Sequence, residues 1–161
     1  MAAIAASAAA AARSSPNDER ALHGIFDASP GELRSITGAV AMFARAAVVV
    51  VAAREKSKTA GAHASESSAA MTMLHRILPV RGLLFEFFLP DEAPTPIYTD
   101  AASVLFSSAG GASVRHTPWL LGRFGAIIQA VDDGEVVFRK VSGTANPPNS
   151  LTKYIAGGEF T

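Results

Sequence analysis

The sequence predicts an α/β domain with a five-stranded mixed sheet flanked by helices. Two observations predict this class. Short apolar and β-branched runs, typical of strands, alternate with longer stretches of helical spacing. Their order is three strands, helices, a strand, helices, a strand and a helix, with no internal repeat. The length of 161 residues is enough for one domain with a sizeable core.

The first third of the chain predicts three strands. Residues 22–27 form an apolar run that ends in a carboxylate, and residues 28–32 (Ala-Ser-Pro-Gly-Glu) have the composition of a turn. Two further apolar strands are expected at residues 39–43 and 47–51. Residues 48–51 are all Val, a pattern typical of a strand that is covered on both faces.

A long helical stretch follows the charged connection at residues 54–58. Ser65 is a suitable N-cap, and apolar residues then recur at helical spacing as far as Leu78. Pro79 is expected to kink or break this helix, because proline lacks the N–H that the helix needs. A second helical piece over residues 80–89 would then end at Pro90.

The second half of the chain predicts two strands and three helices. The expected elements are a strand at 95–99, a short helix at 101–106, a Gly/Ser loop at 107–113, an amphipathic helix at 120–131, a strand at 135–141 and a final helix at 149–155.

The N-terminal residues 1–20 are expected to lie outside the fold as a disordered, Ala-rich leader. Residues 1–15 contain Ala, Ser and Arg13 but no acidic residue, which is the composition of an organelle transit peptide and equally of a low-complexity leader. The folded domain is predicted to span residues 21–157, and residues 158–161 are predicted to form a tail.

The composition limits the kinds of binding site that this chain can form. The chain has a formal net charge of zero, so it lacks the overall basic excess of many nucleic-acid binders, although a local basic face remains open. It contains no Cys, which excludes disulfides and thiolate metal sites and leaves a hard site of oxygen ligands for Mg²⁺ or Mn²⁺. The apolar stretch at residues 38–53 is too short for a membrane span and contains Arg45, so no membrane partner is expected.

Two C-terminal segments carry a family resemblance. Residues 95–100 (Thr-Pro-Ile-Tyr-Thr-Asp) are a short strand ending in a carboxylate, and residues 147–153 read Pro-Pro-Asn-Ser-Leu-Thr-Lys. Together with residues 26–29 (Phe-Asp-Ala-Ser) and 34–38 (Arg-Ser-Ile-Thr-Gly), they resemble the ribonuclease H domain of a copia-type LTR retrotransposon reverse transcriptase polyprotein. The resemblance covers residues 22–155 and implies a ribonuclease H-like fold.

The resemblance also implies a site. Asp27, Glu66 and Asp100 take the positions of the family's metal-binding carboxylates, Glu66 by its ungapped spacing from Gly38. Asn149 takes the fourth catalytic position, where the family has Asp. In such a site two Mg²⁺ or Mn²⁺ ions, roughly 3.5–4 Å apart, activate water against the RNA strand of an RNA–DNA hybrid. The family context adds the reverse transcriptase segment of the parent polyprotein as a partner.

Two alternatives remain open at this stage. One is a catalytically decayed or repurposed ribonuclease H-like domain that serves as a structural or interaction module. It is favoured by Asn149, by a turn before Arg34 that is shorter than the family's, by the poor match of residues 62–65 to the family's motif before Glu66, and by the neutral charge. The other is a domain that binds the hybrid without cutting it, which a basic groove beside the carboxylates would favour. A retroelement origin implies a cytoplasmic or nuclear location, whereas a transit peptide implies organelle import. Six basic side chains are candidates for contacts with the sugar–phosphate backbone of a nucleic acid: Arg76, Arg81, Arg115, Arg123, Arg139 and Lys140.

Overall fold

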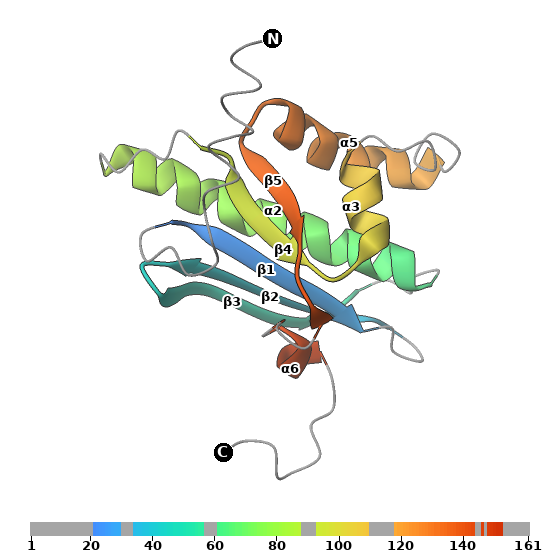
Figure 1. The fold of residues 1–161 in the computed structure, drawn as a ribbon. Coiled ribbons are helices and arrows are strands. Elements are labelled where there is room, and N and C mark those ends of the chain that lie inside the picture. Colours follow the sequence, from blue (N-terminus) through green and yellow to red (C-terminus); the bar gives the residue numbers. More distant parts are fainter. Residues whose placement is uncertain are drawn as a thin grey trace.

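The computed structural model describes residues 21–29, 34–56, 61–87, 93–109, 118–143, 146 and 148–152, and it describes the side-chain surroundings of all of these except 118–121, 123 and 149. Within these ranges the chain forms a five-stranded sheet with helices packed against it (Figure 1). The elements are β1 (His23–Ser29), β2 (Ile36–Phe43), β3 (Ala46–Arg54), α2 (Ala62–Glu86), β4 (Thr95–Thr99), α3 (Ala102–Ser108), α5 (Pro118–Asp132), β5 (Val136–Lys140) and α6 (Asn149–Thr152).

The sheet is mixed, which confirms the predicted fold class. Its strand order is β3-β2-β1-β4-β5. The pairs β1–β2 and β2–β3 are antiparallel, whereas β1–β4 and β4–β5 are parallel. Parallel neighbours need crossover connections, and α2 lies in the chain between β3 and β4 while α3 and α5 lie between β4 and β5. The antiparallel half is therefore one local meander, and the parallel half depends on helices.

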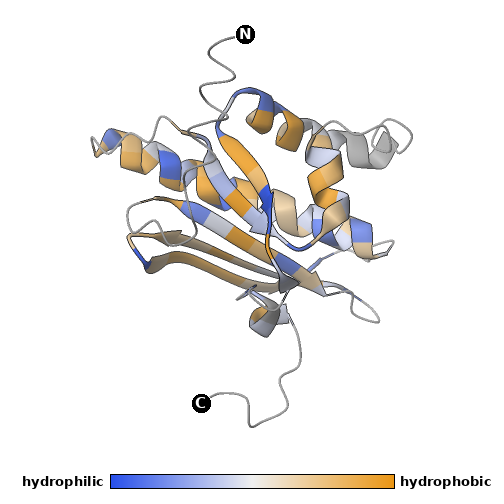
Figure 2. Cartoon of the chain, viewed as in Figure 1, coloured by the Kyte–Doolittle hydropathy of each residue, from blue (hydrophilic) through white to orange (hydrophobic). Residues whose placement is uncertain are grey.

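A tight turn joins β2 to β3. Ala44 and Arg45 both have positive φ, 49° and 65°, which is the pattern of the two-residue turns that match the twist of a hairpin. Figure 2 shows this turn as a short hydrophilic break between two largely hydrophobic strands. The prediction that the Val run is covered on both faces is wrong, because β3 is an edge strand and Val48 and Val50 are 46% and 59% exposed.

Helix α2 is continuous through Pro79, so the predicted break does not occur. Pro79 lies on the exposed side of the helix, where water can reach the carbonyl of His75 that its missing N–H leaves unbonded. The helix begins after Gly61 rather than at Ser65, whose hydroxyl donates to the Gly61 carbonyl at 3.2 Å. The predicted two helical pieces are therefore one helix of 25 residues.

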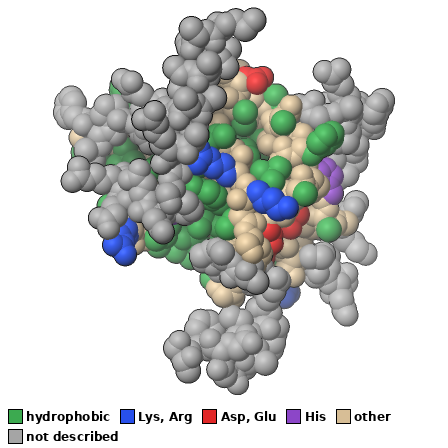
Figure 3. Space-filling view, in the orientation of Figure 1, with side chains coloured by type: hydrophobic (Ala, Val, Ile, Leu, Met, Phe, Trp, Pro, Cys, Tyr) green, Lys and Arg blue, Asp and Glu red, His purple; other side chains and the backbone are tan. Residues whose placement is uncertain are grey.

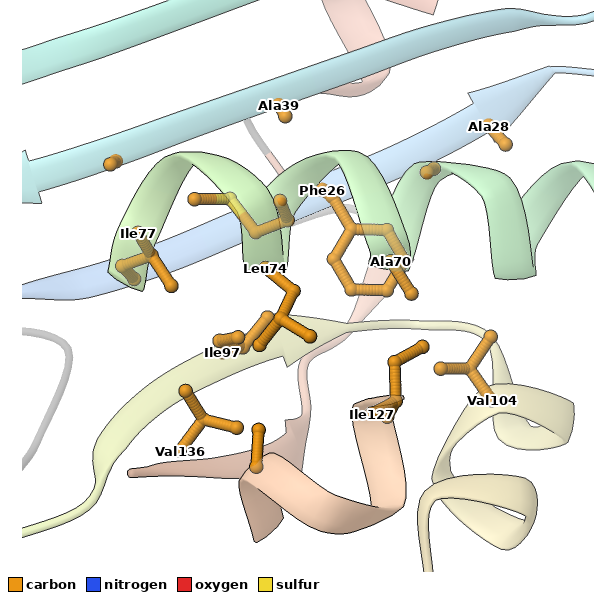
Figure 4. Close-up of a cluster of buried hydrophobic side chains, with 14 of the residues drawn as sticks. Phe26, Ala28, Ala39, Ala70, Leu74, Ile77, Ile97, Val104, Ile127 and Val136 are labelled. Carbon is orange, nitrogen blue, oxygen red and sulfur yellow. The ribbon is translucent and has the colours of Figure 1, made fainter. Parts of the chain in front are cut away.

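The core lies between the sheet and α2, α3 and α5 (Figure 4). Gly24 faces α2 so closely that a Cβ there would lie 3.0 Å from Ile77 Cδ1 and from Met73 Sδ. Because side chains alternate along a strand, Phe26 faces the same helix and is fully buried. The other large buried side chains include Leu74, Ile97, Val104, Phe124, Ile127 and Val136.

The direction of α2 relative to β1 places its first turns at one end of the sheet. Ile77 lies over Gly24, near the start of β1. Figure 4 shows Ala70 nearer the Ala28 end of that strand, so α2 runs antiparallel to β1. The first turns of α2 therefore lie toward the end of the sheet at which β1 and β4 finish.

The remaining differences from the predicted elements are small. The fourth strand is Thr95–Thr99, as predicted, and the fifth is one residue shorter at each end. Helix α3 extends to Ser108, so the first two residues of the predicted loop are helical. The proposed leader at 1–20 and the tail at 158–161 lie outside the described residues. No described helix is both long enough and apolar enough to cross a membrane.

His23 is a buried ionisable group at the start of β1. Its ring packs edge-on against Tyr98, with centroids 6.1 Å apart. Nδ1 lies 3.3 Å from the carbonyl oxygen of Ala21, and because a carbonyl only accepts, Nδ1 carries the hydrogen. Burial lowers the pKa of His23 from its usual 6.5, and the bond to Ala21 only partly opposes this.

Replacement of Phe26 by Ala tests the core. We expect Phe26→Ala to reduce the free energy of unfolding by about 3–5 kcal/mol, because it removes a fully buried ring. Phe106, which is 58% exposed, is the matched control, and Phe106→Ala should change stability by less than about 0.5 kcal/mol. Urea unfolding followed by circular dichroism measures both. Equal losses in the two variants would contradict the assigned core.

The lowered pKa of His23 predicts a pH dependence of stability. The unfolded chain binds a proton on His23 near pH 6.5, whereas the folded chain does so only at lower pH. Stability is therefore fully present above pH 6.5 and falls as the pH drops from 6.5 toward the folded pKa. Urea midpoints between pH 7.5 and 5 should fall less in His23→Gln than in the parent chain. Identical pH profiles would rule out a contribution from His23.

Candidate functional site

Asp27 lies near the end of β1, and Asp100 directly follows β4, the neighbouring parallel strand. In the β1–β4 pair, Gly24 is level with Ile97 and Ile25 with Tyr98. Continuing this register by two residues brings Asp27 level with Asp100, which directly follows β4. Level residues of parallel strands point to the same face of the sheet. The structure therefore confirms that the two strands are neighbours. The prediction that the first strand ends at Asp27 is wrong, because β1 pairs with β2 for two further residues, as far as Ser29.

Asp27 faces away from α2, toward the short helix α6. Gly24 and Phe26 face α2, so the alternate residue Asp27 projects from the opposite face. There its Oδ2 accepts a hydrogen bond from the Thr152 hydroxyl, and Asp27 is only 4% exposed. Figure 1 shows α6 beside the arrowheads of β1 and β5.

Gly38 allows α6 to approach the sheet. It is the β2 residue paired with Asp27. A Cβ at this position would lie 2.9 Å from both the Pro148 carbonyl oxygen and Thr152 Cγ2, closer than real contacts allow. Helix α6 therefore rests on the backbone of Gly38, and this close packing brings the Thr152 hydroxyl to Asp27.

Asp100 is held by the segments that follow β5. Its Oδ1 accepts a hydrogen bond of 3.5 Å from Nδ2 of Asn146, which also donates to the Phe26 carbonyl at 3.3 Å. Its Oδ2 lies beside Gly143, where a Cβ would come within 3.0 Å of it. Asp100 as a residue is partly exposed to solvent.

The other two predicted site residues are placed less completely. Glu66 lies near the start of α2, toward the same end of the sheet, with Oε2 shielded from solvent. Asn149 opens α6, but its side chain is outside the description. In the described part of the chain, no three His, Asp or Glu side chains form a group that could hold a metal ion. The structure thus brings Asp27 and Asp100 together but does not gather Glu66 with them.

Two buried polar residues beside the aspartates were not predicted from the sequence. Asn146 and Thr152 are each 4% exposed, and each donates to one of the two carboxylates. A sequence signal for Thr152 existed, because it lies three residues after Asn149 and so shares a helix face with it. Asn146 lies in irregular chain, where no periodicity indicates the direction of a side chain.

Arg81 has a structural role. Its guanidinium donates to the Ala93 carbonyl at 2.9 Å and to the Thr95 hydroxyl at 2.8 Å, which fastens α2 to the start of β4. Of the other basic candidates, Arg76 and Lys140 are exposed, while Arg115 and the side chain of Arg123 lie outside the description. In Figure 3, small basic and acidic clusters lie close to one another on the visible face.

Solved structures of other proteins have a similar fold. LC11-RNase H1, isolated from compost by a metagenomic approach, superposes with a TM-score of 0.64 at 14% identity, over 82% of this chain and 92% of that chain. The fold is ribonuclease H-like. A structure of LC11-RNase H1 in complex with an RNA/DNA hybrid gives a TM-score of 0.58 at 15% identity, over 81% of this chain and 92% of that chain.

Sequence comparisons add no relative to these structures. No protein-family model matches the chain, and no curated protein matches it. At 14–15% identity, the structural likeness establishes the ribonuclease H-like fold and leaves the chemistry to the residues of the site.

A side chain at position 38 should displace α6. We expect Gly38→Ala to lower the free energy of unfolding by about 1–3 kcal/mol, because the added Cβ meets backbone that must move. Gly82→Ala is the control, since its Cβ meets nothing within 4 Å and Ala favours a helix over Gly by about 1 kcal/mol. Urea unfolding measures both. A Gly38→Ala variant as stable as the parent would contradict the close packing of α6 against Gly38.

Proposed function

We propose that this chain is a ribonuclease H that hydrolyses the RNA strand of RNA–DNA hybrids with Mg²⁺ or Mn²⁺. The observation that carries the proposal is the β1–β4 register, which, continued by two residues, brings Asp27 level with Asp100 near the ends of two central strands. The ribonuclease H-like fold supports it, as does the RNA/DNA hybrid bound by a protein of similar fold.

The chemistry of the donors fits a hard divalent cation. Asp27 and Asp100 offer carboxylate oxygens, and the chain has no Cys to favour a softer metal. Mg²⁺ is usually bound through one or two protein carboxylates together with water and substrate phosphates. Two adjacent aspartates are therefore enough to begin such a site, and an RNA phosphate would complete it.

Each residue of the proposed site has a definite task. Asp27 and Asp100 would hold the cation between the strand ends, Glu66 would approach from α2, and Asn149 would offer a neutral amide oxygen from α6. When bound, the divalent ion supplies an activated water and a Lewis acid for the leaving oxygen. The hybrid would be recognised through its phosphates and 2′-hydroxyls rather than its base sequence.

We also propose a copia-type retrotransposon origin for this domain. The motifs at residues 95–100 and 147–153 support it, because they resemble the family's motifs in their residues and in their spacing. On this proposal the parent polyprotein's reverse transcriptase segment is a partner that helps hold the hybrid.

A second candidate function is a ribonuclease H-like module that has lost catalysis. Two observations favour it: Asn149 stands where the resembling family has Asp, and the described residues hold no three-ligand group. Such a protein would retain the fold and would bind a hybrid or a protein partner without cutting RNA.

A cleavage assay separates the two candidates. With a labelled RNA–DNA hybrid and Mg²⁺ or Mn²⁺, we expect cutting of the RNA strand only. Asp100→Asn should reduce the rate by more than about 100-fold, since losing even an outer partner of a metal ligand costs 10- to 100-fold.

Asp132→Asn is the matched control, because Asp132 is exposed at the end of α5, and its rate should equal that of the parent. If the folded parent chain cuts no RNA with either metal, the catalytic proposal is wrong and the second candidate stands.

A further inference from the structure

The segment after β5 contributes one polar side chain to each of the two aspartates. Thr152 donates its hydroxyl to Asp27, and Asn146 donates its amide hydrogens to Asp100 and to the Phe26 carbonyl. Both residues are buried, and they lie only six positions apart in the chain. One short segment thus reaches both strand ends.

The orientation of the Asn146 amide is fixed by its surroundings. The Phe26 carbonyl and the Asp100 carboxylate can only accept hydrogen bonds, so the nitrogen must face both of them. The opposite orientation would place oxygen against oxygen. Oδ1 is then left buried, with no hydrogen-bond partner among the residues that the structure describes.

We propose that Thr152 and Asn146 are positioning residues, which hold Asp27 and Asp100 in place as a pair to receive a cation. This inference rests on the proposed metal site. Hydrogen bonds to ionised carboxylates are stronger than those between neutral groups, so two donors can offset part of the repulsion between adjacent aspartates. Because both donors are uncharged, they add no positive charge that would compete with a divalent cation, as a Lys or Arg would.

The two groups of Thr152 allow a matched test. Its methyl packs against Gly38, whereas its hydroxyl bonds to Asp27. Thr152→Val keeps the packing and removes the donor, and Thr152→Ser keeps the donor and removes the methyl. The probe is Mn²⁺ alone, titrated calorimetrically into the full chain, with urea midpoints measured for the same samples.

We expect Thr152→Val to weaken Mn²⁺ binding 10- to 100-fold, the usual effect of losing an outer partner of a metal ligand, and Thr152→Ser to bind nearly as the parent does. Asn146→Ala should also weaken binding 10- to 100-fold. If Val and Ser weaken binding equally, or if neither Val nor Ala weakens it, the positioning roles are wrong.

A double-mutant cycle keeps this test separate from the proposed function. In urea unfolding, the midpoint shifts of Thr152→Val and Asp27→Ala should be non-additive, because either variant removes the same hydrogen bond. If Asp27→Ala does not fold, Asp27→Leu takes its place, because Leu removes both acceptor oxygens and still fills the space. A parent chain that binds no Mn²⁺ but shows this coupling would overturn the metal site and retain the contact. Additive shifts would overturn the positioning role of Thr152.

Discussion

The parallel pairing of β1 with β4 is the constraint on which the rest of this structure depends. It joins the local meander of β1, β2 and β3 to the helix-connected half of the sheet, which holds β4 and β5. The same pairing sets a different chemistry on each face of β1. Phe26 is buried against the helices, whereas its neighbour Asp27 emerges on the other face, level with Asp100. A slip of one residue would exchange these faces, so core packing and the carboxylate pair are fixed by one register.

The face of the sheet opposite α2 carries α6, and the approach of this helix depends on the glycine at position 38. Gly38 lets α6 lie against the backbone of β2, and the short helix then presents Thr152 to Asp27. Asn146, earlier in the same segment, ties the Phe26 carbonyl to Asp100. Residues 146 and 148–152 therefore contact the strand tips through hydrogen bonds and through the close approach of α6 to the backbone of Gly38.

Much of the fold could be predicted from local sequence, and the failures have physical causes. The run at Thr95–Thr99 is short and partly β-branched, so it indicated its strand correctly. The Val run indicated a strand but not its burial, because local composition does not reveal that β3 is an edge. Pro79 is tolerated because it faces solvent, which depends on how α2 packs. Asp27 and Asp100 were predicted as neighbours, and the helical spacing of Thr152 from Asn149 was a signal for Thr152. No periodicity indicates that Asn146, in irregular chain, reaches Asp100.

The central claim is that Asp27 and Asp100 form one cation site at the strand ends. Paramagnetic broadening by Mn²⁺ in amide NMR spectra of the full chain tests it most directly, because it locates the ion without requiring catalysis. The claim predicts that small additions of Mn²⁺ first broaden the amide signals of residues 26–28 and 99–101, and that Asp100→Asn removes this effect. Broadening centred elsewhere in the chain, or none at all, would contradict it.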